Sequence, residues 1–241
     1  MPCVEFTTET MPKFDRSLLP AEPDLSFELA LWGAGLHVIA GIDEAGRGAL
    51  AGPVAAAAVV LPPDETIASH LAGVRDSKQM TPVQREQTRE RIIQHAIAWA
   101  VGLSTCEEID QLGILPATKL AACRAVESLD LTPEHLLLDY LFLPEISIPQ
   151  TALTKGDCRS LSIAAASVLA KTTRDAILLE LDQTYPGYGF ARHKGYGTAA
   201  HRAALIRLGA CPVHRLSFTL YDNSNLRIDE TLPDIELLTD G

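Results

Sequence analysis

Short apolar runs alternate with amphipathic stretches along most of this chain, and their order predicts its architecture. Residues 37–42 (HVIAGI) form an apolar run that suits a buried strand, and residues 53–61 (PVAAAAVVL) suit a second strand paired with it as a hairpin. The glycine-rich segment 46–48 supplies a bend between them. Further strands are predicted at 98–104, 135–138 and 151–154.

Helices are predicted between these strands, because two polar segments begin with a capping pattern. Thr81 is followed by a proline at the first helical position and by Gln84, which opens a helix that should reach about residue 96. Thr105 and Glu108 repeat the pattern for a short helix. Further helices are expected at 117–129, 162–181 and 198–208. This order predicts an α/β domain with a mixed sheet flanked by helices and a small helical C-terminal region.

Both ends of the chain differ from this central pattern. Residues 1–36 lack clear periodicity and read as an N-terminal extension, with a short helix between Asp24 and Leu36. Residues 222–241 are polar and acidic, and we expect a poorly ordered tail there. One domain is therefore assigned to residues 37–221.

Composition argues against several classes of protein. Hydrophobic residues make up 47% of the chain, enough for a sizeable core, yet no apolar run approaches the roughly 18 residues that a membrane span requires. The first residues lack the apolar segment of a secretory signal. The five cysteines are widely spaced without a CxxC pair, which argues against a zinc site or a disulfide framework. We expect a cytoplasmic, monomeric protein with reduced thiols.

The net charge of −11 is unevenly distributed, which matters because a polyanionic ligand requires a basic surface. Residues 155–221 carry nine Lys and Arg against four Asp and Glu, whereas residues 38–154 carry eight against 15. An acidic metal-binding region facing a basic phosphate-binding region fits this asymmetry. Chance unevenness of solvated surface charge is the alternative explanation.

Carboxylates follow two of the predicted strands. Asp43 and Glu44 end the first strand within GIDEAGRG, and the glycines after them would break the strand and admit a closely approaching nucleic-acid backbone. Asp139 ends the strand at 135–138, the edge where ligands bind in open α/β sheets. Taken singly, a solvated acid pair at a strand end explains the first feature equally well, and a helix or turn cap explains the second better.

Basic and small residues gather in the last third of the chain. Lys155 and Arg159 lie in a loop at a helix start, a setting suited to phosphate oxygens. The Ala-rich helix that follows contains Lys171 and Asp175 one turn apart, a spacing that by itself indicates a surface ion pair. The later RHKGYGT loop places Tyr196 between two glycines, where it would contact a sugar hydroxyl or simply cover the core.

Read together and in order, these segments resemble the type 2 ribonuclease H family (ribonuclease HII). The resemblance rests on GIDEAGRG, DSK at 76–78, the strand ending in Asp139, KGD at 155–157, AAASVLAKTTRD, the HKGYGT loop and HRLSF at 214–218. It covers residues 38 to about 221, and the set is far more specific than any one motif. Two positions depart from the family pattern: Gly197 replaces the usual proline after Tyr196, and Tyr140 follows Asp139 where Gly or Ala is common.

The resemblance implies a ribonuclease H-like fold and a metal-dependent endoribonuclease. The catalytic and metal-holding acids implied by it are Asp43, Glu44, Asp139 and Asp175. The tripeptide that meets the RNA–DNA junction and the tyrosine beside it match Gly46, Arg47, Gly48 and Tyr196. Phosphate contacts, which position a duplex without reading its bases, are expected from Lys155, Arg159, Lys171, Arg192, Lys194 and Arg215.

Four converging carboxylates repel one another, so such a cluster takes up protons or binds cations, and oxygen ligands select Mg²⁺ or Mn²⁺. Two such ions can activate water and stabilise the departing oxygen. We therefore expect phosphodiester hydrolysis that leaves 5′-phosphate and 3′-hydroxyl ends. The resemblance implies that the substrates are the RNA strand of RNA–DNA hybrids and single ribonucleotides in duplex DNA, cut on their 5′ side. The backbone amides of residues 46–48 and the Tyr196 hydroxyl are the expected readers of the 2′-hydroxyl.

Two other functions remain as alternatives. A type 3 ribonuclease H carries a substantial N-terminal substrate-binding domain, and residues 1–36 are too short and too acidic for one. A catalytically silent hybrid-binding protein would gain nothing from clustered acids. A replication or repair protein docking on the acidic tail is a further hypothesis, although the tail shows no defined docking motif.

Overall fold

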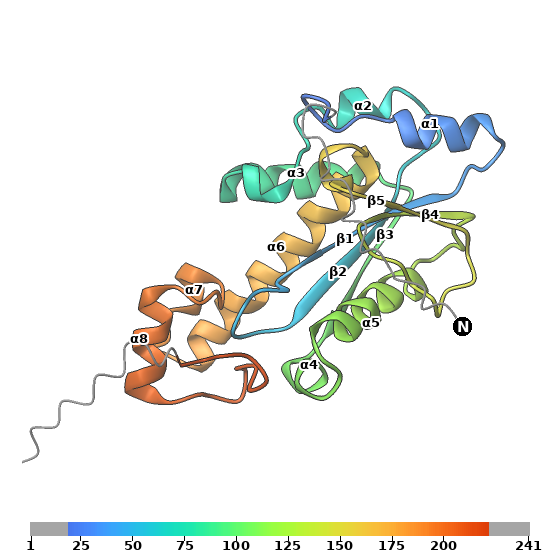
Figure 1. Cartoon of the computed structure of the whole chain (residues 1–241). Coiled ribbons are helices and arrows are strands. Elements are labelled where there is room, and N and C mark those ends of the chain that lie inside the picture. Colours follow the sequence, from blue (N-terminus) through green and yellow to red (C-terminus); the bar gives the residue numbers. More distant parts are fainter. Residues whose placement is uncertain (1–18, 222–241) are drawn as a thin grey trace, which may run out of the picture.

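The computed structural model describes residues 19–221, and its centre is a five-stranded mixed sheet (Figure 1). The strand order is β3-β2-β1-β4-β5. Strands β1, β2 and β3 are antiparallel neighbours, while β4 and β5 extend the sheet from β1 in parallel. The strands are β1 Ile39–Ala45, β2 Val54–Val60, β3 Ala98–Ser104, β4 His135–Asp139 and β5 Gln150–Leu153. All five predicted strands are present, so the mixed α/β sheet is confirmed.

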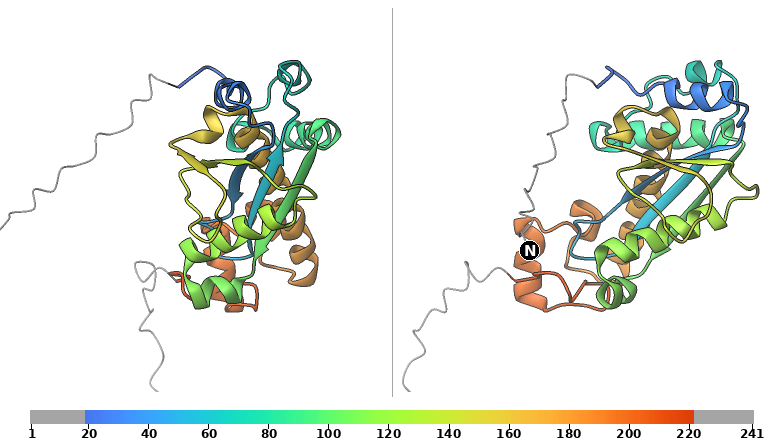
Figure 2. Two further views of the ribbon diagram at one scale, coloured as in Figure 1. Left: turned by 90° about the vertical axis from the view of Figure 1, so that its right-hand side faces the viewer. Right: turned by 45° about the vertical axis from the view of Figure 1, so that its right-hand side comes forward.

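Helices cover both faces of the sheet (Figure 2). Helix α5 packs on one face, and α6 packs on the other together with α2 and α3. The helices are α2 Ile67–His70, α3 Pro82–His95, α4 Cys106–Leu112, α5 Ile114–Glu127 and α6 Leu161–Thr184. Both predicted capping boxes, at Thr81 and at Thr105, are formed. Within residues 19–221, no helix combines the length and the apolar character needed to cross a membrane.

Helix α6 begins in direct contact with β1 because residue 41 is a glycine. A Cβ atom added to Gly41 would collide with the backbone of Ser162 and Ile163 at the start of the helix. Ala164, Ala165 and Ala166 are fully buried in the same turn, so small side chains keep the helix close to the sheet. This close packing carries the polar middle of α6 over the end of β1.

Residues 24–33 are packed on the domain rather than separate from it. The predicted short helix is present as α1, Ser26–Gly33, and it covers the start of α6. The buried carboxylate of Glu28 accepts hydrogen bonds from the Ser160 hydroxyl (2.6 Å) and from the backbone N–H (3.0 Å) and hydroxyl (2.6 Å) of Ser162. The domain therefore includes α1. The expectations for residues 1–18 and for the tail at 222–241 lie outside the described residues.

The predicted C-terminal helical region lies at the opposite end of the molecule from α1 (Figure 1). It contains α7 Phe190–His193 and α8 Ala199–Leu208, which share a small core with the end of α6. The region is joined to the glycine-rich bend, because the N–H of Leu50 donates to the carbonyl of Gly195 (2.8 Å). The loop after β1 and the Tyr196 loop are therefore held side by side.

Candidate active site

Asp43 and Glu44 lie inside strand β1, which runs past its predicted end at residue 42 to Ala45. The strand continues because each acid is in register with an alanine of β2, Asp43 with Ala57 and Glu44 with Ala56. Neighbouring strand residues face opposite sides, and Asp43 accordingly faces Ser167 of α6 while Glu44 lines an open cleft. The glycines therefore bend the chain after the acids, not between them.

The Asp43 carboxylate is buried and incompletely paired. Its Oδ1 accepts a hydrogen bond from the backbone N–H of Glu44 (2.7 Å), whereas Oδ2 has no partner among the described residues. Burial raises the pKa of Asp43 well above its usual value, and the negative charges of Glu44 and Asp139 raise it further. The protein thus holds a carboxylate where its charged form is costly.

Asp139 lies beside Asp43 because β4 is the parallel neighbour of β1, with Leu138 opposite Ile42. The backbone N–H of Gly156 donates to Asp139 Oδ1 (2.8 Å). Burial raises the pKa of Asp139 to about 6, and the charge of Asp157 contributes next. These strand ends therefore place Asp43 and Asp139 close enough for their charges to interact.

Asp157 is the fourth acid at this site, and the sequence analysis missed it. It lies in the short 3-10 turn Gly156–Cys158 that follows β5, next to β4 in the sheet. Its side chain is 2% exposed, and its Oδ1 has no hydrogen-bond partner among the described residues. The signal available in the sequence was an acid shortly after the strand predicted at residues 151–154. We call Asp43, Glu44, Asp139 and Asp157 the acidic cluster.

Lys78, from the DSK segment, is held beside the acidic cluster. Desolvation lowers its pKa, but nearby carboxylates outweigh that effect and raise the pKa above its usual value. The carboxylates responsible are Asp76, Asp43, Asp157 and Asp139. Lys78 therefore remains a cation at neutral pH and offsets part of the cluster's negative charge.

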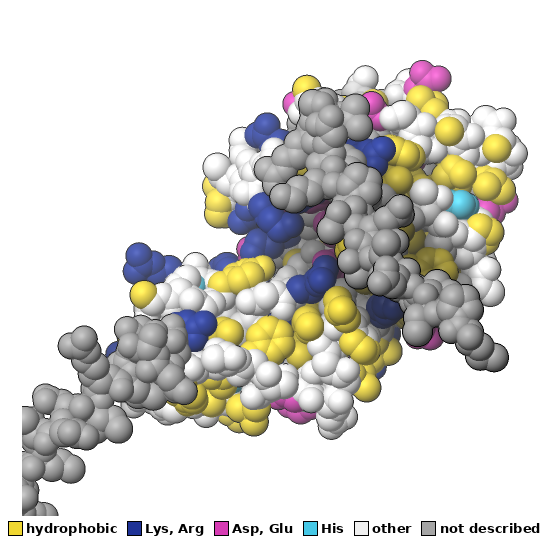
Figure 3. All heavy atoms as spheres, viewed as in Figure 1, with side chains coloured by type: hydrophobic (Ala, Val, Ile, Leu, Met, Phe, Trp, Pro, Cys, Tyr) yellow, Lys and Arg dark blue, Asp and Glu magenta, His cyan; other side chains and the backbone are white. Residues whose placement is uncertain are grey.

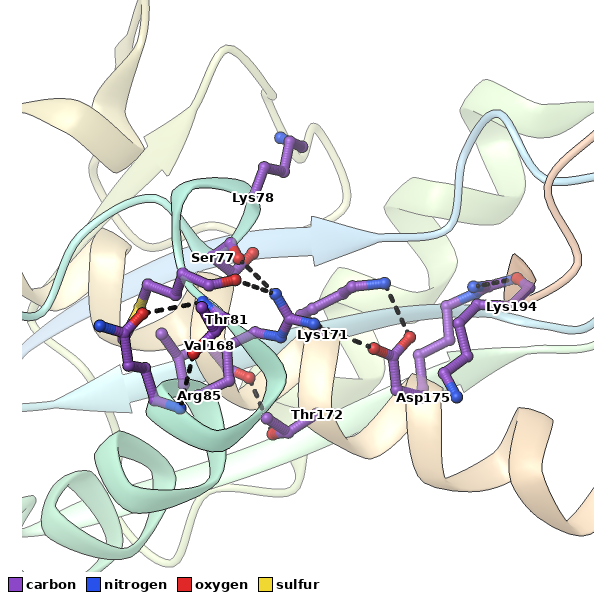
Figure 4. A network of polar contacts seen from close by, with 12 residues as sticks. Ser77, Lys78, Thr81, Arg85, Val168, Lys171, Thr172, Asp175 and Lys194 are labelled. Carbon is purple, nitrogen blue, oxygen red and sulfur yellow. Dashed lines mark hydrogen bonds and ion pairs between the residues drawn. The ribbon is translucent and has the colours of Figure 1, made fainter. Parts of the chain in front are cut away.

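Asp175 lies apart from the acidic cluster, in an ion-pair network (Figure 4). Its carboxylate is 2.7 Å from the Lys171 Nζ and 3.7 Å from an Arg85 Nη. It is about 12 Å further along α6 than Ser167, which lies beside Asp43, at the rise of about 1.5 Å per helical residue. The pairing of Lys171 with Asp175 one turn later is the ion pair that the spacing alone indicated.

A cleft of about 710 Å³ opens in front of Glu44, and we call it the central cleft. It is lined by the bend at residues 46–48, by Lys78 and Lys171, and by Tyr196. The Tyr196 ring lies 5.7 Å from the Lys171 Nζ, measured to the ring centre. The structure therefore brings the predicted junction-binding tripeptide and its tyrosine together beside the acids.

Two buried arginines hold the walls of this cleft. Arg174 donates to the carbonyls of Ala51 (2.9 Å), Pro53 (2.8 Å) and Lys194 (2.9 Å), so it ties the bend to the Tyr196 loop. Its side chain fills the space that a Cβ on Gly46 would need, and φ of Gly46 is +95°, so both facts favour glycine there.

The phosphate contact predicted for Arg215 is wrong. The side chain is 0% exposed and donates to the carbonyls of Gly52 (2.8 and 3.0 Å) and Arg47 (2.9 Å). Burial lowers the pKa of Arg215 to about 10, and the positive charge of Arg174 contributes next, so Arg215 still carries its charge at neutral pH. Arg215 supports the bend at residues 46–48 from behind and cannot reach a nucleic-acid phosphate.

The other predicted phosphate contacts fall in different places. Lys171, Arg192 and Lys194 line a groove of about 590 Å³ that continues from the central cleft between α3 and α7. Figure 3 shows Lys and Arg side chains gathered around a hollow on this face. Lys155 is exposed at the turn before Asp157, whereas the Arg159 guanidinium lies 4.9 Å from the Phe27 ring centre, toward α1.

The donor atoms of the acidic cluster suit a divalent cation. Asp43 Oδ2 and Asp157 Oδ1 are buried without partners among the described residues, and such oxygens normally bind a proton or a cation. Asp157 also lies in a group with Asp76 and Cys158, whose potential ligand atoms are within 4.8 Å of one another. Burial and the charge of Asp157 raise the pKa of Cys158 to about 11, so its thiol stays protonated and oxygen atoms remain the available donors. Oxygen donors favour Mg²⁺ or Mn²⁺ over zinc.

Several known proteins are similar to this chain in sequence and in fold. The family model described as Ribonuclease HII matches residues 40–221. The chain is 52% identical over 194 residues to ribonuclease HII of Anaeromyxobacter sp. (strain Fw109-5), covering 80% of this chain and 60% of that protein. It is 50% identical over 203 residues to a ribonuclease HII of Thermus thermophilus, covering 84% of this chain and 96% of that protein.

Solved structures give the same result. The chain resembles a chain in the structure of the PCNA–RNase HII complex from Archaeoglobus fulgidus, with a TM-score of 0.65 and 26% identity over 77% of this chain and 96% of that one. The match of the type 2 family model over most of the domain favours the type 2 interpretation over the type 3 alternative. This chain belongs to the ribonuclease HII family.

Proposed function

We propose that this protein is an endonuclease that hydrolyses the RNA strand of RNA–DNA hybrids and cuts 5′ of single ribonucleotides in duplex DNA. The products would carry 5′-phosphate and 3′-hydroxyl ends. The observation that carries the proposal is the acidic cluster, buried and incompletely paired, beside a cleft lined by residues 46–48 and Tyr196. Family membership supports the same activity.

In this proposal Asp157 takes the role that the sequence analysis expected of Asp175. Asp157 is buried with an unpaired oxygen and raises the pKa of Asp139, whereas Asp175 is paired with two cations. We assign Asp175 to holding Lys171 and Arg85 in place.

Mg²⁺ or Mn²⁺ would be held by the carboxylates of the acidic cluster. Two such ions would supply water activation and charge neutralisation at the departing oxygen. Lys78, in the turn before α3, and Lys171, in α6, both line the central cleft. Their positive charges would position the phosphate that is cleaved. Arg174 and Arg215 keep the bend at residues 46–48 rigid, so its backbone amides are oriented before substrate binds.

Cation binding should depend on pH, because burial raises the pKa of Asp139 to about 6 and that of Asp43 well above its usual value. Folding raises the pKa of the Asp139 carboxyl, so its protonated form stabilises the metal-free protein. This contribution is complete below the unfolded-state pKa of roughly 3.9 and is lost as the pH rises through about 6. Cations replace the lost protons only above that pH. We expect Mn²⁺ to raise the unfolding temperature strongly at pH 7.5 and weakly at pH 5.

Thermal unfolding with and without Mn²⁺ at the two pH values measures this dependence. Asp139→Asn is the control, and it should show a small increase at both. An equal increase at pH 5 and pH 7.5 in the unsubstituted protein would contradict the proposed ligands.

Tyr196 is proposed to contact the ribose 2′-hydroxyl, the group that distinguishes RNA from DNA at one nucleotide. Tyr196→Phe removes only the hydroxyl and should lower cleavage at a single embedded ribonucleotide by about tenfold, roughly the effect of losing one hydrogen bond. Duplex affinity should change less, since the ring still packs beside Lys171. Cleavage rates and affinities on duplexes with one ribonucleotide check both.

Tyr221→Phe makes the same chemical change at an exposed position outside the cleft and should leave both values unaltered. Equal losses of affinity and cleavage in Tyr196→Phe would instead indicate a purely structural tyrosine.

A catalytically silent hybrid-binding protein is the alternative, and cleavage tests with Mn²⁺, with Mg²⁺ and with EDTA distinguish the two. The Archaeoglobus fulgidus complex adds reason to keep a replication partner as a hypothesis for this chain. Its expected docking segment, residues 222–241, lies outside the described residues.

A further inference from the structure

A second hollow adjoins the central cleft, and we call it the side groove. It has a volume of about 720 Å³ and lies between α5 and the segment after β4. Arg47 lines both hollows, so the side groove continues the central cleft past the bend at residues 46–48. A long ligand that occupies the cleft can therefore extend into the groove.

Exposed apolar side chains line this groove. Tyr140 is 76% exposed, Phe142 56% and Leu115 51%. Adjacent exposed apolar side chains on a protein surface commonly mark a binding site. Two cations, Arg47 and Lys119, lie among them.

Tyr140 follows Asp139 directly and has an unfavourable backbone conformation. Its φ is +54°, and it is one of three non-glycine residues with positive φ between residues 19 and 221. This left-handed conformation is unfavourable for a non-glycine residue. The hydrogen bond from the Tyr140 N–H to the Leu153 carbonyl (3.0 Å) fixes the backbone, while the exposed side chain recovers little of that cost by packing. Residues held in sparsely populated backbone conformations cluster at active sites and ligand-binding sites.

We propose that the side groove binds the duplex beyond the cleavage site, with the Tyr140 and Phe142 rings packed on sugars exposed in the minor groove. Arg47 and Lys119 would lie near the flanking phosphates. A duplex containing RNA offers a wide, shallow minor groove that such side chains can reach. Glu127 and Glu145 also line the side groove, so phosphates are favoured only toward the Arg47 end.

This inference rests on the proposed function, because it needs a duplex in the central cleft. The decisive variant is Tyr140→Gly, which removes the ring and relieves the backbone strain, so it should not lower the unfolding temperature. Its dissociation constant for a labelled RNA–DNA hybrid, measured in EDTA, should rise about fivefold or more, because the contact between the ring and the sugars is lost. With Mg²⁺, kcat at saturating hybrid should stay unchanged while KM rises.

Two further variants complete the test. Tyr140→Phe keeps the ring and should bind as tightly as the unsubstituted protein. Ile206→Ala removes an apolar side chain that is 60% exposed on α8, and it should change neither affinity nor KM. Unchanged affinity of Tyr140→Gly would overturn the inference and leave the groove to a protein partner. A failure of the proposed function looks different, because the unsubstituted protein would then bind hybrid without cleaving it.

Discussion

Asp139→Asn is expected to lower kcat for cleavage of an RNA–DNA hybrid by on the order of 10³-fold, about 4 kcal/mol of transition-state stabilisation. The amide keeps the shape of the carboxylate, and its oxygen can still accept the hydrogen bond from Gly156. What it removes is one negative charge at the centre of the acidic cluster. Cation binding and the reaction that depends on it should fail together, while the fold persists.

Stability separates this loss from unfolding. Because burial and like charges raise the pKa of Asp139 to about 6, its charged form is unfavourable in the metal-free protein at pH 7.5. Asp139→Asn should therefore unfold at the same temperature or higher in EDTA. Asp130→Asn, at an exposed position before β4, is the matched control and should cleave normally. Hybrid cleavage by Asp139→Asn at the unsubstituted rate would remove Asp139 from the mechanism.

Asp157→Asn should mainly lower kcat, whereas Asp175→Asn should mainly lower the free energy of unfolding. Asp157→Asn alters a buried carboxylate of the acidic cluster, so it should lower kcat about 100-fold or more and reduce the stabilisation by Mn²⁺. Asp175→Asn leaves that cluster intact and should keep kcat within about tenfold. It deprives Lys171 and Arg85 of a shared partner, so it should cost about 1–3 kcal/mol of unfolding free energy.

Hybrid cleavage and Mn²⁺-dependent unfolding, measured on both variants together, compare the two acids. A normal kcat for Asp157→Asn, with a collapse for Asp175→Asn, would restore the assignment that the family resemblance first implied. It would also require α6 to move Asp175 toward the acidic cluster during the reaction.

The hydrophobic pattern was sufficient to place the strands, because a sheet covered on both faces needs continuous apolar runs. Strand β2 is buried along its whole length, and its predicted bounds differ by one residue at each end. The pattern placed the end of β1 too early, since Asp43 and Glu44 are polar. Backbone pairing with the alanines of β2 continues through them regardless of side-chain polarity.

Which acids share the site was harder to predict, because this depends on which strand ends are neighbours in the sheet. Asp157 and Asp175 both lie in motifs of the family, and their positions along the chain do not show which of the two lies beside Asp139. The pairing of β5 with β4 brings Asp157 to Asp139, whereas Asp175 is carried away along α6. The phosphate contact predicted for Arg215 was wrong for a related reason. The backbone carbonyls that accept hydrogen bonds from the buried Arg215 belong to a bend far away in the sequence.

Cleavage-site mapping tests the central claim most directly. The substrate is duplex DNA containing one ribonucleotide, incubated with the unsubstituted protein and with Asp139→Asn in Mn²⁺, Mg²⁺ or EDTA. We predict one cut on the 5′ side of the ribonucleotide, with 3′-hydroxyl and 5′-phosphate ends, only in the presence of a cation and only by the unsubstituted protein. Cutting in EDTA, or binding of the duplex without cutting in either cation, would contradict the account.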